Sequence, residues 1–156
     1  MPPPIPTTAP LKPFYKNPIL GPMVLGEAPL FRCSSANNTN TLHWVDPLKT
    51  PSELHILHLN PDSSLPAGDA KTLILEDSVS VMCFRKGRTG SYICAYYQGI
   101  AFLDEETGKL DVVREIISES ERGGMRLNDV ENQGDGYIGA VDAKGRFWVA
   151  EIDKKV

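Results

Sequence analysis

Four consecutive residues in the last third of the chain, Arg126-Leu127-Asn128-Asp129, bring together a cation, an amide and a carboxylate. The planar guanidinium of Arg126 suits carboxylate or polyol oxygens, and the amide of Asn128 can both donate and accept hydrogen bonds. In a strand these two side chains would point to the same side, whereas Asp129 would point to the other side and brace a turn. The four residues fit either a substrate-holding edge or a polar turn, and taken alone they favour the turn.

A second candidate is Glu27, which lies among small residues in VLGEAPLF (residues 24–31). Its carboxylate could serve as a metal ligand or general base at the mouth of a β-structure, although a lone loop glutamate is more often simply solvated. His55 and His58 would lie on opposite faces of a strand, so we expect surface or interface histidines and not a metal pair. The sequence contains no Gly-x-Ser-x-Gly elbow, P-loop or dinucleotide fingerprint, which leaves serine-based hydrolysis and nucleotide chemistry without support.

Short apolar bursts separated by turn-forming residues predict an all-β protein. The bursts are rich in aromatic and β-branched residues, and the connectors RKGRTG, DEETGK and DAKG carry glycines or side chains that favour hairpin turns. The segment VVREII fits a helix or a strand, and we interpret it as a strand that runs into a polar loop. The predicted strands are 41–46, 54–59, 71–76, 79–84, 91–97, 99–104, 136–141 and 145–152.

A weak repeat underlies these strands. LHWVD (42–46), YICAY (92–96) and RFWVA (146–150) are similar segments that start about 50 residues apart, and such a period is typical of β-propeller blades. At this period the chain holds about three blades, whereas a propeller closes with roughly four to eight. The sequence therefore predicts a partial β-propeller.

Composition narrows the class of protein. The chain has 156 residues, a formal net charge of −4 and no cluster of Lys and Arg, so a nucleic-acid partner is not expected. Three cysteines without a Cys-x-x-Cys spacing predict free thiols in a reducing compartment, and no segment predicts a signal peptide or membrane span. We expect a cytoplasmic protein with a proline-rich leader over residues 1–23 and a single domain over residues 24–156.

Taken in order, five pieces resemble the N-terminal half of the senescence marker protein/gluconolactonase/luciferin-regenerating enzyme-like family, over about residues 24–152. The departures are Ala28 and Phe31, where the family has Gly and Trp, the additional residues VENQGDGYIGA, and Glu151 in place of a small residue. The pieces are GEAPLF, HWVD, RTGSYICAYYQGIAFLDEETGKL, MRLNDV and VDAKGRFWVAEI.

The resemblance implies a six-bladed β-propeller with one divalent metal, Ca²⁺ or Zn²⁺, in a central funnel where a lactone is hydrolysed. By the resemblance, Glu27 matches a metal ligand, and Arg126 and Asn128 match residues that hold the substrate. The other ligands of the family, an Asn and the catalytic Asp, belong to later blades, so no general base is assigned in this chain. Two alternatives stay open, a non-catalytic half-propeller that binds or assembles and a truncated relic, and a half-propeller is expected to self-associate through its exposed sheet edges.

Overall fold

The computed structural model describes residues 13–18, 22–34, 39–124, 127–132, 137–142 and 147–151. Within these ranges the strands form three antiparallel sheets, and the only helix is a short 3-10 helix, η1 (Glu119–Gly124). No helix in the described ranges is long and apolar enough to cross a membrane. The chain is all-β, as predicted.

Each sheet is built from strands that follow one another along the chain. Sheet A has the order β1-β2-β3-β4, sheet B the order β5-β6-β7-β8, and sheet C the order β9-β10-β11. Such consecutive hairpins are the construction of propeller blades, and the three sheets form a partial β-propeller. The strands are β1 (Glu27–Ser34), β2 (Thr39–Asp46), β3 (Glu53–Leu59), β4 (Lys71–Ile74), β5 (Val79–Phe84), β6 (Ser91–Tyr96), β7 (Gly99–Asp104), β8 (Leu110–Glu115), β9 (Leu127–Asn132), β10 (Tyr137–Asp142) and β11 (Phe147–Glu151).

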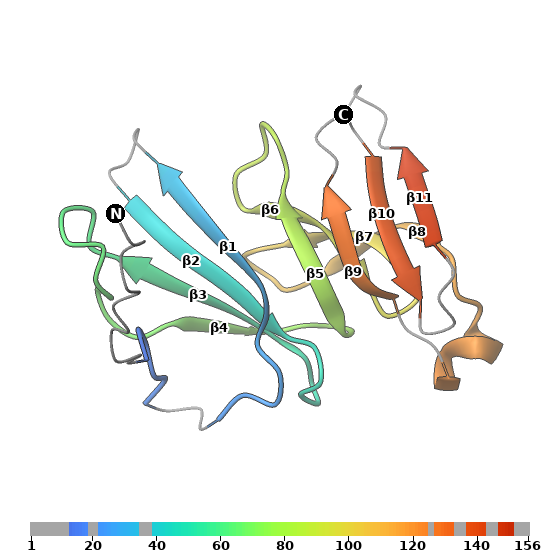
Figure 1. Cartoon of the computed structure of the whole chain (residues 1–156), viewed down its shortest axis with the longest axis horizontal. Helices are drawn as coiled ribbons and strands as arrows, with labels where there is room; N and C mark the ends of the chain where they lie inside the picture. The colour runs from blue at the N-terminus through green and yellow to red at the C-terminus, as the bar shows by residue number, and fades with distance from the viewer. Residues whose placement is uncertain are drawn as a thin grey trace, which may run out of the picture.

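The first strands of the three sheets lie at the centre of the arrangement. β5 packs against β1 on one side and against β9 on the other. In Figure 1 all three strands run in the same direction and begin at the lower end of the view. We call β1, β5 and β9 the inner strands, because they face the position of a propeller axis.

Sheet B is apolar on both faces because it is packed between two neighbours. Along β6, Tyr92, Cys94 and Tyr96 join the core shared with sheet A, whereas Ile93 and Ala95 belong to the clusters on the side of sheet C. Successive side chains of a strand point to opposite faces, so a strand buried on both faces must be apolar at nearly every position. SYICAY has this composition for that reason.

The structure corrects three parts of the strand prediction. Residues 24–31 were expected to precede the first strand, but β1 begins at Glu27, and residues 127–129 form the start of β9 where a polar turn was favoured. The third copy of the repeat is also wrong: LHWVD and YICAY are in the second strands of their sheets, whereas residues 147–150 are in the third strand of sheet C. The matching segment is YIGAVD of β10. The strand predicted in VVREII is confirmed as part of β8.

A chain of buried hydrogen bonds joins sheets A and B. Arg32 and the Tyr92 hydroxyl both donate to the carboxylate of Glu105, at 2.9 and 2.7 Å from Oε2. Because the Tyr92 proton is used there, Nδ1–H of His43 donates to the Tyr92 oxygen at 2.8 Å, and Nε2 accepts from the Thr41 hydroxyl at 2.7 Å. The network therefore fixes His43 as a neutral imidazole with its proton on Nδ1.

Burial and charge set the pKa values in this network. Burial of the imidazole, reinforced by the Arg32 guanidinium, lowers the pKa of His43 from 6.5 to about 4. Burial, followed by the hydrogen bond to Glu105, raises the pKa of Tyr92 above its ordinary value. Burial alone would raise the pKa of Glu105, but hydrogen bonds from Arg32 and Tyr92 outweigh it and lower that pKa. At neutral pH His43 is therefore neutral, Tyr92 is protonated and Glu105 is ionised, as the hydrogen bonds between them require.

Asp46 fixes the path of the chain into β1. It lies at the end of β2, is fully buried, and accepts hydrogen bonds from the backbone N–H groups of Val24 at 2.8 Å, Leu25 at 3.1 Å and Lys49 at 3.3 Å. The three backbone donors thus satisfy a carboxylate that is itself fully buried. The clamp holds residues 24 and 25 in place and so sets where Glu27 enters the sheet.

The described part of the predicted leader lies against sheet A. The Tyr15 hydroxyl accepts a hydrogen bond from the backbone N–H of Ala70 at 2.9 Å, and its ring meets Trp44 edge-on at 6.1 Å. Nε1–H of Trp44 in turn donates to Sδ of Met23 at 3.1 Å. The leader therefore covers the face of sheet A that points away from sheet B.

The burial of the histidines and the state of the cysteines confirm the predictions only in part. His58 is exposed, but His43 and His55 are buried, so the expectation of surface or interface positions fails for His55, which lies beneath the leader. His55 and His58 do lie on opposite faces of β3, as their spacing requires. The three cysteines are free, although Cys94 alone is buried, and its burial raises the pKa of its thiol to about 12.

The Asp46 clamp predicts a large cost on truncation. Asp46→Ala leaves three backbone donors without their acceptor, and we expect a loss of about 3 kcal/mol in the free energy of unfolding, measured by urea denaturation at pH 7. Asp111→Ala, at an exposed position of β8, is the matched control and should change stability by less than about 0.5 kcal/mol. Equal losses in the two variants would show that the clamp contributes nothing specific.

The His43 network predicts destabilisation in mild acid. The pKa of His43 is lower in the folded chain than in the unfolded chain, so the unfolded chain takes up the proton first on acidification. We expect stability to be complete above about pH 6.5 and to fall by up to about 3 kcal/mol as the pH approaches 4. His43→Gln should flatten this dependence in urea denaturation series, and His58→Gln should preserve it. A profile unchanged by His43→Gln would contradict the assignment.

Candidate functional site

The candidate site is the opening, which we define as the end where the inner strands begin, at residues 24–28, 77–80 and 127–129. Strand register relates these segments. Glu27 of β1 pairs with Val45, and Asn128 of β9 pairs with Val141. Val45 and Val141 are each the penultimate residue of the second strand, so Glu27 and Asn128 occupy equivalent positions in sheets A and C.

Each inner strand has one extra residue directly after this position. The register shifts between Glu27 and Leu30 in β1, at Ser80 in β5, and at Asp129 in β9. A β-bulge bends its strand and redirects the neighbouring side chains, and bulges are common next to functional sites. The recurrence of the bulge in all three sheets makes the opening a repeated structural feature.

Glu27 is the unpaired carboxylate of the opening. It is half-buried, and within the part of the chain that the structure describes it accepts no hydrogen bond and makes no ion pair. The Asp46 clamp positions the two residues that lie two and three places before it. A carboxylate held in place and not neutralised is suited to bind a cation or to take up a proton.

Of the three predicted site residues, the structure describes Glu27 and the backbone of Asn128. These two residues occupy equivalent positions in sheets A and C, with β5 of sheet B between them. Arg126 lies outside the described residues. The role of Arg126 therefore stays a prediction.

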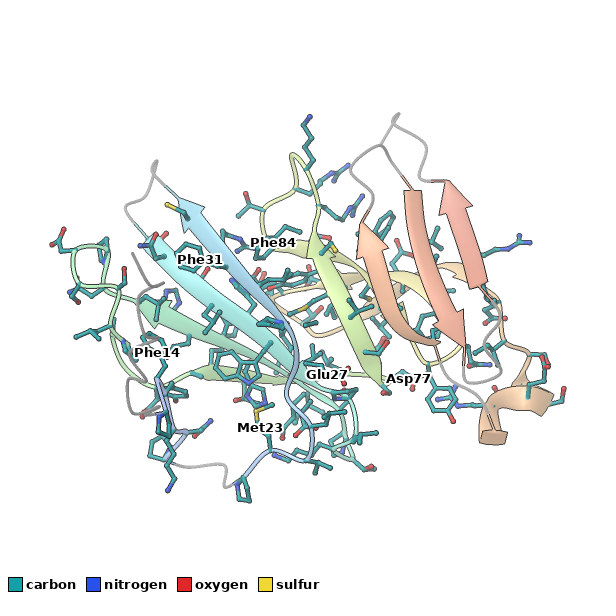
Figure 2. All side chains as sticks on the ribbon, viewed as in Figure 1. Phe14, Met23, Glu27, Phe31, Asp77 and Phe84 are labelled. Atoms are coloured by element: carbon teal, nitrogen blue, oxygen red, sulfur yellow. The ribbon has the colours of Figure 1, made fainter. Side chains whose placement is uncertain are left out.

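A polar cluster at the opening was not found by sequence reasoning. Arg122 of η1 donates to both carboxylate oxygens of Asp77 at 2.8 Å and to Oε1 of Gln98 at 2.5 Å, and its guanidinium lies 4.8 Å from the ring centre of Tyr97. The Tyr97 hydroxyl donates back to the Arg122 carbonyl. Figure 2 labels Asp77 and Glu27, both at the lower end of the central strands in this view. Asp77 is thus a paired carboxylate, in contrast to Glu27.

The sequence signal for Asp77 lies in the repeat. Val79 of β5 pairs with Tyr96 and directly precedes a bulge, as Asn128 does in sheet C. In the sequence, Asp77 lies two residues before Val79, as Arg126 lies two residues before Asn128. Alignment of WVD (44–46), AYY (95–97) and AVD (140–142) across the three sheets would have revealed this equivalence. The misplaced third repeat concealed it.

Two buried polar atoms beside the opening have no hydrogen bond within the described residues. They are the hydroxyls of Ser80, at the bulge of β5, and of Tyr96, on the adjoining strand. Burial, with the nearby charges of Glu115 and Asp77, raises the pKa of Tyr96, so its hydroxyl stays protonated at neutral pH. Both groups can donate, and an unsatisfied buried donor is unusual enough to indicate a polar environment at this end of the sheets.

The described residues do not form a complete metal site. They contain no group of three or more His, Cys, Asp and Glu side chains that could hold an ion. Asp77 is occupied by Arg122, so among the described residues Glu27 is the one free carboxylate at the opening. One carboxylate fits a single position in a coordination sphere, and a Ca²⁺ or Zn²⁺ site needs several.

The fold and the opening together define a partial β-propeller whose polar residues gather where the inner strands begin. Its fold is similar to a solved structure of luciferin-regenerating enzyme, with a TM-score of 0.56 and 17% sequence identity. The match covers 85% of this chain and 47% of that one, so the chain spans about half the length of the structure it matches. No protein-family model and no curated protein matches the sequence. At this identity the likeness shows the fold alone.

The bulge of β1 predicts an effect of residue 28. Ala28 has a positive φ of 49°, a conformation that glycine adopts without steric cost. We expect Ala28→Gly to keep or raise the free energy of unfolding by up to about 1 kcal/mol, and Ala28→Val to lower it by about 1 to 2 kcal/mol, because a β-branched side chain resists positive φ. Thermal unfolding of the two variants measures both effects. A valine variant as stable as the glycine variant would contradict the observed backbone conformation.

Proposed function

We propose that this chain forms part of a lactone hydrolase and supplies the substrate-holding side of its funnel. The observation that supports this most directly is the equivalence of Glu27 and Asn128, which stand directly before the bulges of two inner strands at the opening. Both residues, with Arg126, are also those that match the gluconolactonase-like pattern in the sequence. The fold likeness to luciferin-regenerating enzyme agrees with the same assignment.

The proposed roles follow from the chemistry of the side chains. Arg126 and Asn128 donate hydrogen bonds to the oxygens of a small-molecule lactone and orient its ring. Glu27 contributes one oxygen ligand to a divalent cation, Ca²⁺ or Zn²⁺. When bound, such a cation would polarise the ring carbonyl and lower the pKa of a water molecule.

The described residues do not complete that metal site. Further ligands and the general base would come from sheets additional to the three described, in keeping with the length of the neighbouring structure. The chain's own contribution is to bind and orient the substrate. Arg126 and Asn128 carry that contribution, and Glu27 adds one metal ligand.

A non-catalytic half-propeller is the second candidate, in which the chain binds or assembles without hydrolysis. It is favoured by the placement of the leader, which covers the outer face of sheet A through Tyr15 and Met23. It is also consistent with the exposure of β8, the edge strand of sheet B, which leaves backbone groups available for pairing with another chain. This candidate function predicts that the purified chain self-associates.

The test of the hydrolase is metal-dependent turnover. The full protein, with the sheets that complete its propeller, is titrated with Ca²⁺, Zn²⁺ and Mn²⁺ against a panel of sugar and aromatic lactones, and hydrolysis is followed by acid release. We expect at least one metal to raise the rate and Glu27→Gln to lower the metal-dependent rate by at least about 100-fold, because it removes a charged ligand. Glu106→Gln, in the exposed turn after β7, is the matched control.

The two candidates differ in the outcome of this titration. If no metal changes the turnover of any lactone, the hydrolase is ruled out for this chain, and the binding module remains. Sedimentation velocity on the purified chain then tests assembly: concentration-dependent dimers or larger species support the module, and a monomer at all concentrations counts against it.

A further inference from the structure

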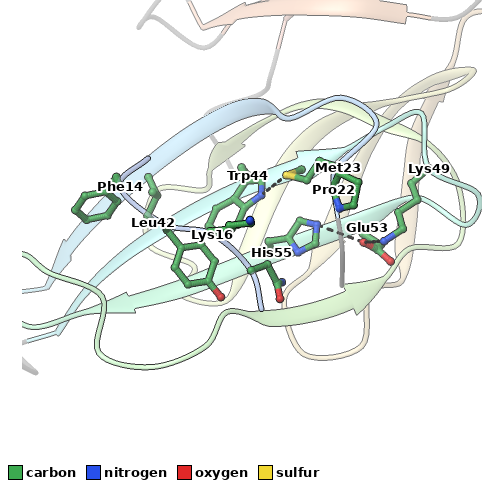
Figure 3. Close-up of a pocket in the computed structure, with 11 residues that line it drawn as sticks. Phe14, Lys16, Pro22, Met23, Leu42, Trp44, Lys49, Glu53 and His55 are labelled. Carbon is green, nitrogen blue, oxygen red and sulfur yellow. Dashed lines mark hydrogen bonds and ion pairs between the residues drawn. The ribbon is translucent and has the colours of Figure 1, made fainter. Parts of the chain in front are cut away.

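A cavity of about 400 Å³ lies between the leader and the outer face of sheet A, apart from the opening of the inner strands. Its floor is formed by the outward side chains of β2 and β3, and its walls by residues 14–17 and 22–23 of the leader (Figure 3). This volume falls within the range of ligand pockets in proteins. The surface of the lining is mainly apolar, as is usual for such pockets, and His55, Glu53 and Lys49 lie at one end of it (Figure 3).

The apolar part of the cavity is aromatic. Trp44 stacks on the ring of His55 with centroids 5.2 Å apart and an interplanar angle of 18°, and Tyr15 contacts Trp44 edge-on. Phe14, at the rim, is 53% exposed. Flat walls of this kind favour a flat ring, because aromatic rings gain from stacked and edge-to-face contacts.

The polar end of the cavity has an unused hydrogen-bonding group. His55 is 2% exposed, and its Nδ1 is 3.0 Å from Oγ1 of Thr72. Its Nε2 makes no hydrogen bond within the described residues, although it lies 3.4 Å from Oε2 of Glu53. Glu53 is itself buried and accepts a hydrogen bond from Lys49 at 2.7 Å.

The protonation of this end sets what it can bind. Burial lowers the pKa of His55, so the imidazole is neutral at physiological pH. With the Nε2 proton directed toward the Glu53 carboxylate, the Thr72 hydroxyl donates to Nδ1, and Nε2–H is a donor that lacks an acceptor in good geometry. A ligand hydroxyl can accept from Nε2–H and donate to the carboxylate, whereas an ether can only accept and an ammonium group can only donate.

Charge excludes a cationic ligand. The lining carries Lys16 and Lys49 against the single carboxylate of Glu53, so with a neutral His55 its formal charge is positive. An ammonium group would meet this excess of positive charge, whereas a neutral hydroxyl would not.

We propose that this cavity binds a neutral aromatic ring that carries a hydroxyl group, a ligand of the phenol class. The ring lies among Trp44, Tyr15 and Phe14, and the hydroxyl reaches His55 and Glu53. The site is separate from the proposed lactone site and does not depend on it.

The test compares three probes of the same size on the full chain by isothermal titration calorimetry. The probes are p-cresol, toluene, which lacks the hydroxyl, and 4-methylbenzylamine, which is cationic. We expect p-cresol to bind with a Kd on the order of 10⁻⁴ M and the other two at least about tenfold more weakly. No binding of p-cresol at millimolar concentration, equal binding of toluene, or tighter binding of the amine would each overturn the proposal.

Three substitutions test whether p-cresol binds in this cavity. His55→Phe keeps a stacked ring but removes the nitrogen, and should weaken p-cresol binding at least about tenfold while toluene binding is kept. His58→Phe, on the opposite face of β3, is the matched control and should bind as the parent does. Met23→Trp fills the cavity from its exposed rim without altering the sheet and should abolish binding even if His55→Phe fails to fold. Unchanged p-cresol binding in Met23→Trp places the ligand elsewhere and overturns the proposal.

Discussion

Burial of sheet B on both of its faces is the constraint on which the structure depends. A sheet with apolar side chains on both sides cannot be stable alone in water, so sheets A and C must stack against it. The direction of stacking then brings the three inner strands together, and with them the ends at which they begin.

Polar interactions decide how the stacked sheets are aligned. The hydrogen bonds from Thr41 through His43 and Tyr92 to Glu105 cross from sheet A to sheet B and are satisfied in one arrangement of protons. Asp46 acts at the opposite end of β2, where it fixes the entry of the chain into β1. Hydrophobic burial therefore gives the assembly its stability, and these buried polar groups give it a defined register near Glu27.

The sequence predicted the fold better than the site, for identifiable reasons. Strands such as β5 and β7 have continuous apolar runs with turns at both ends, and their predicted bounds of 79–84 and 99–104 match the structure. β1 was missed because Gly26 and Pro29 resemble a loop, whereas the structure accommodates Pro29 in a bulge. The pairing of Asp77 with Arg122 spans 45 residues, and no local pattern indicates it. The burial of His55 depends on the leader, whose prolines give no sign of where it docks.

The position of the leader also bears on how the array of sheets could be extended. The outer face of sheet A is the surface on which a further blade would stack if the ring were to close, and residues 14–17 and 22–23 already occupy part of that surface. A blade that docked there would have to displace the leader and break the Tyr15–Ala70 and Trp44–Met23 hydrogen bonds. Docking of the leader and docking of a further blade therefore compete for the same face of sheet A.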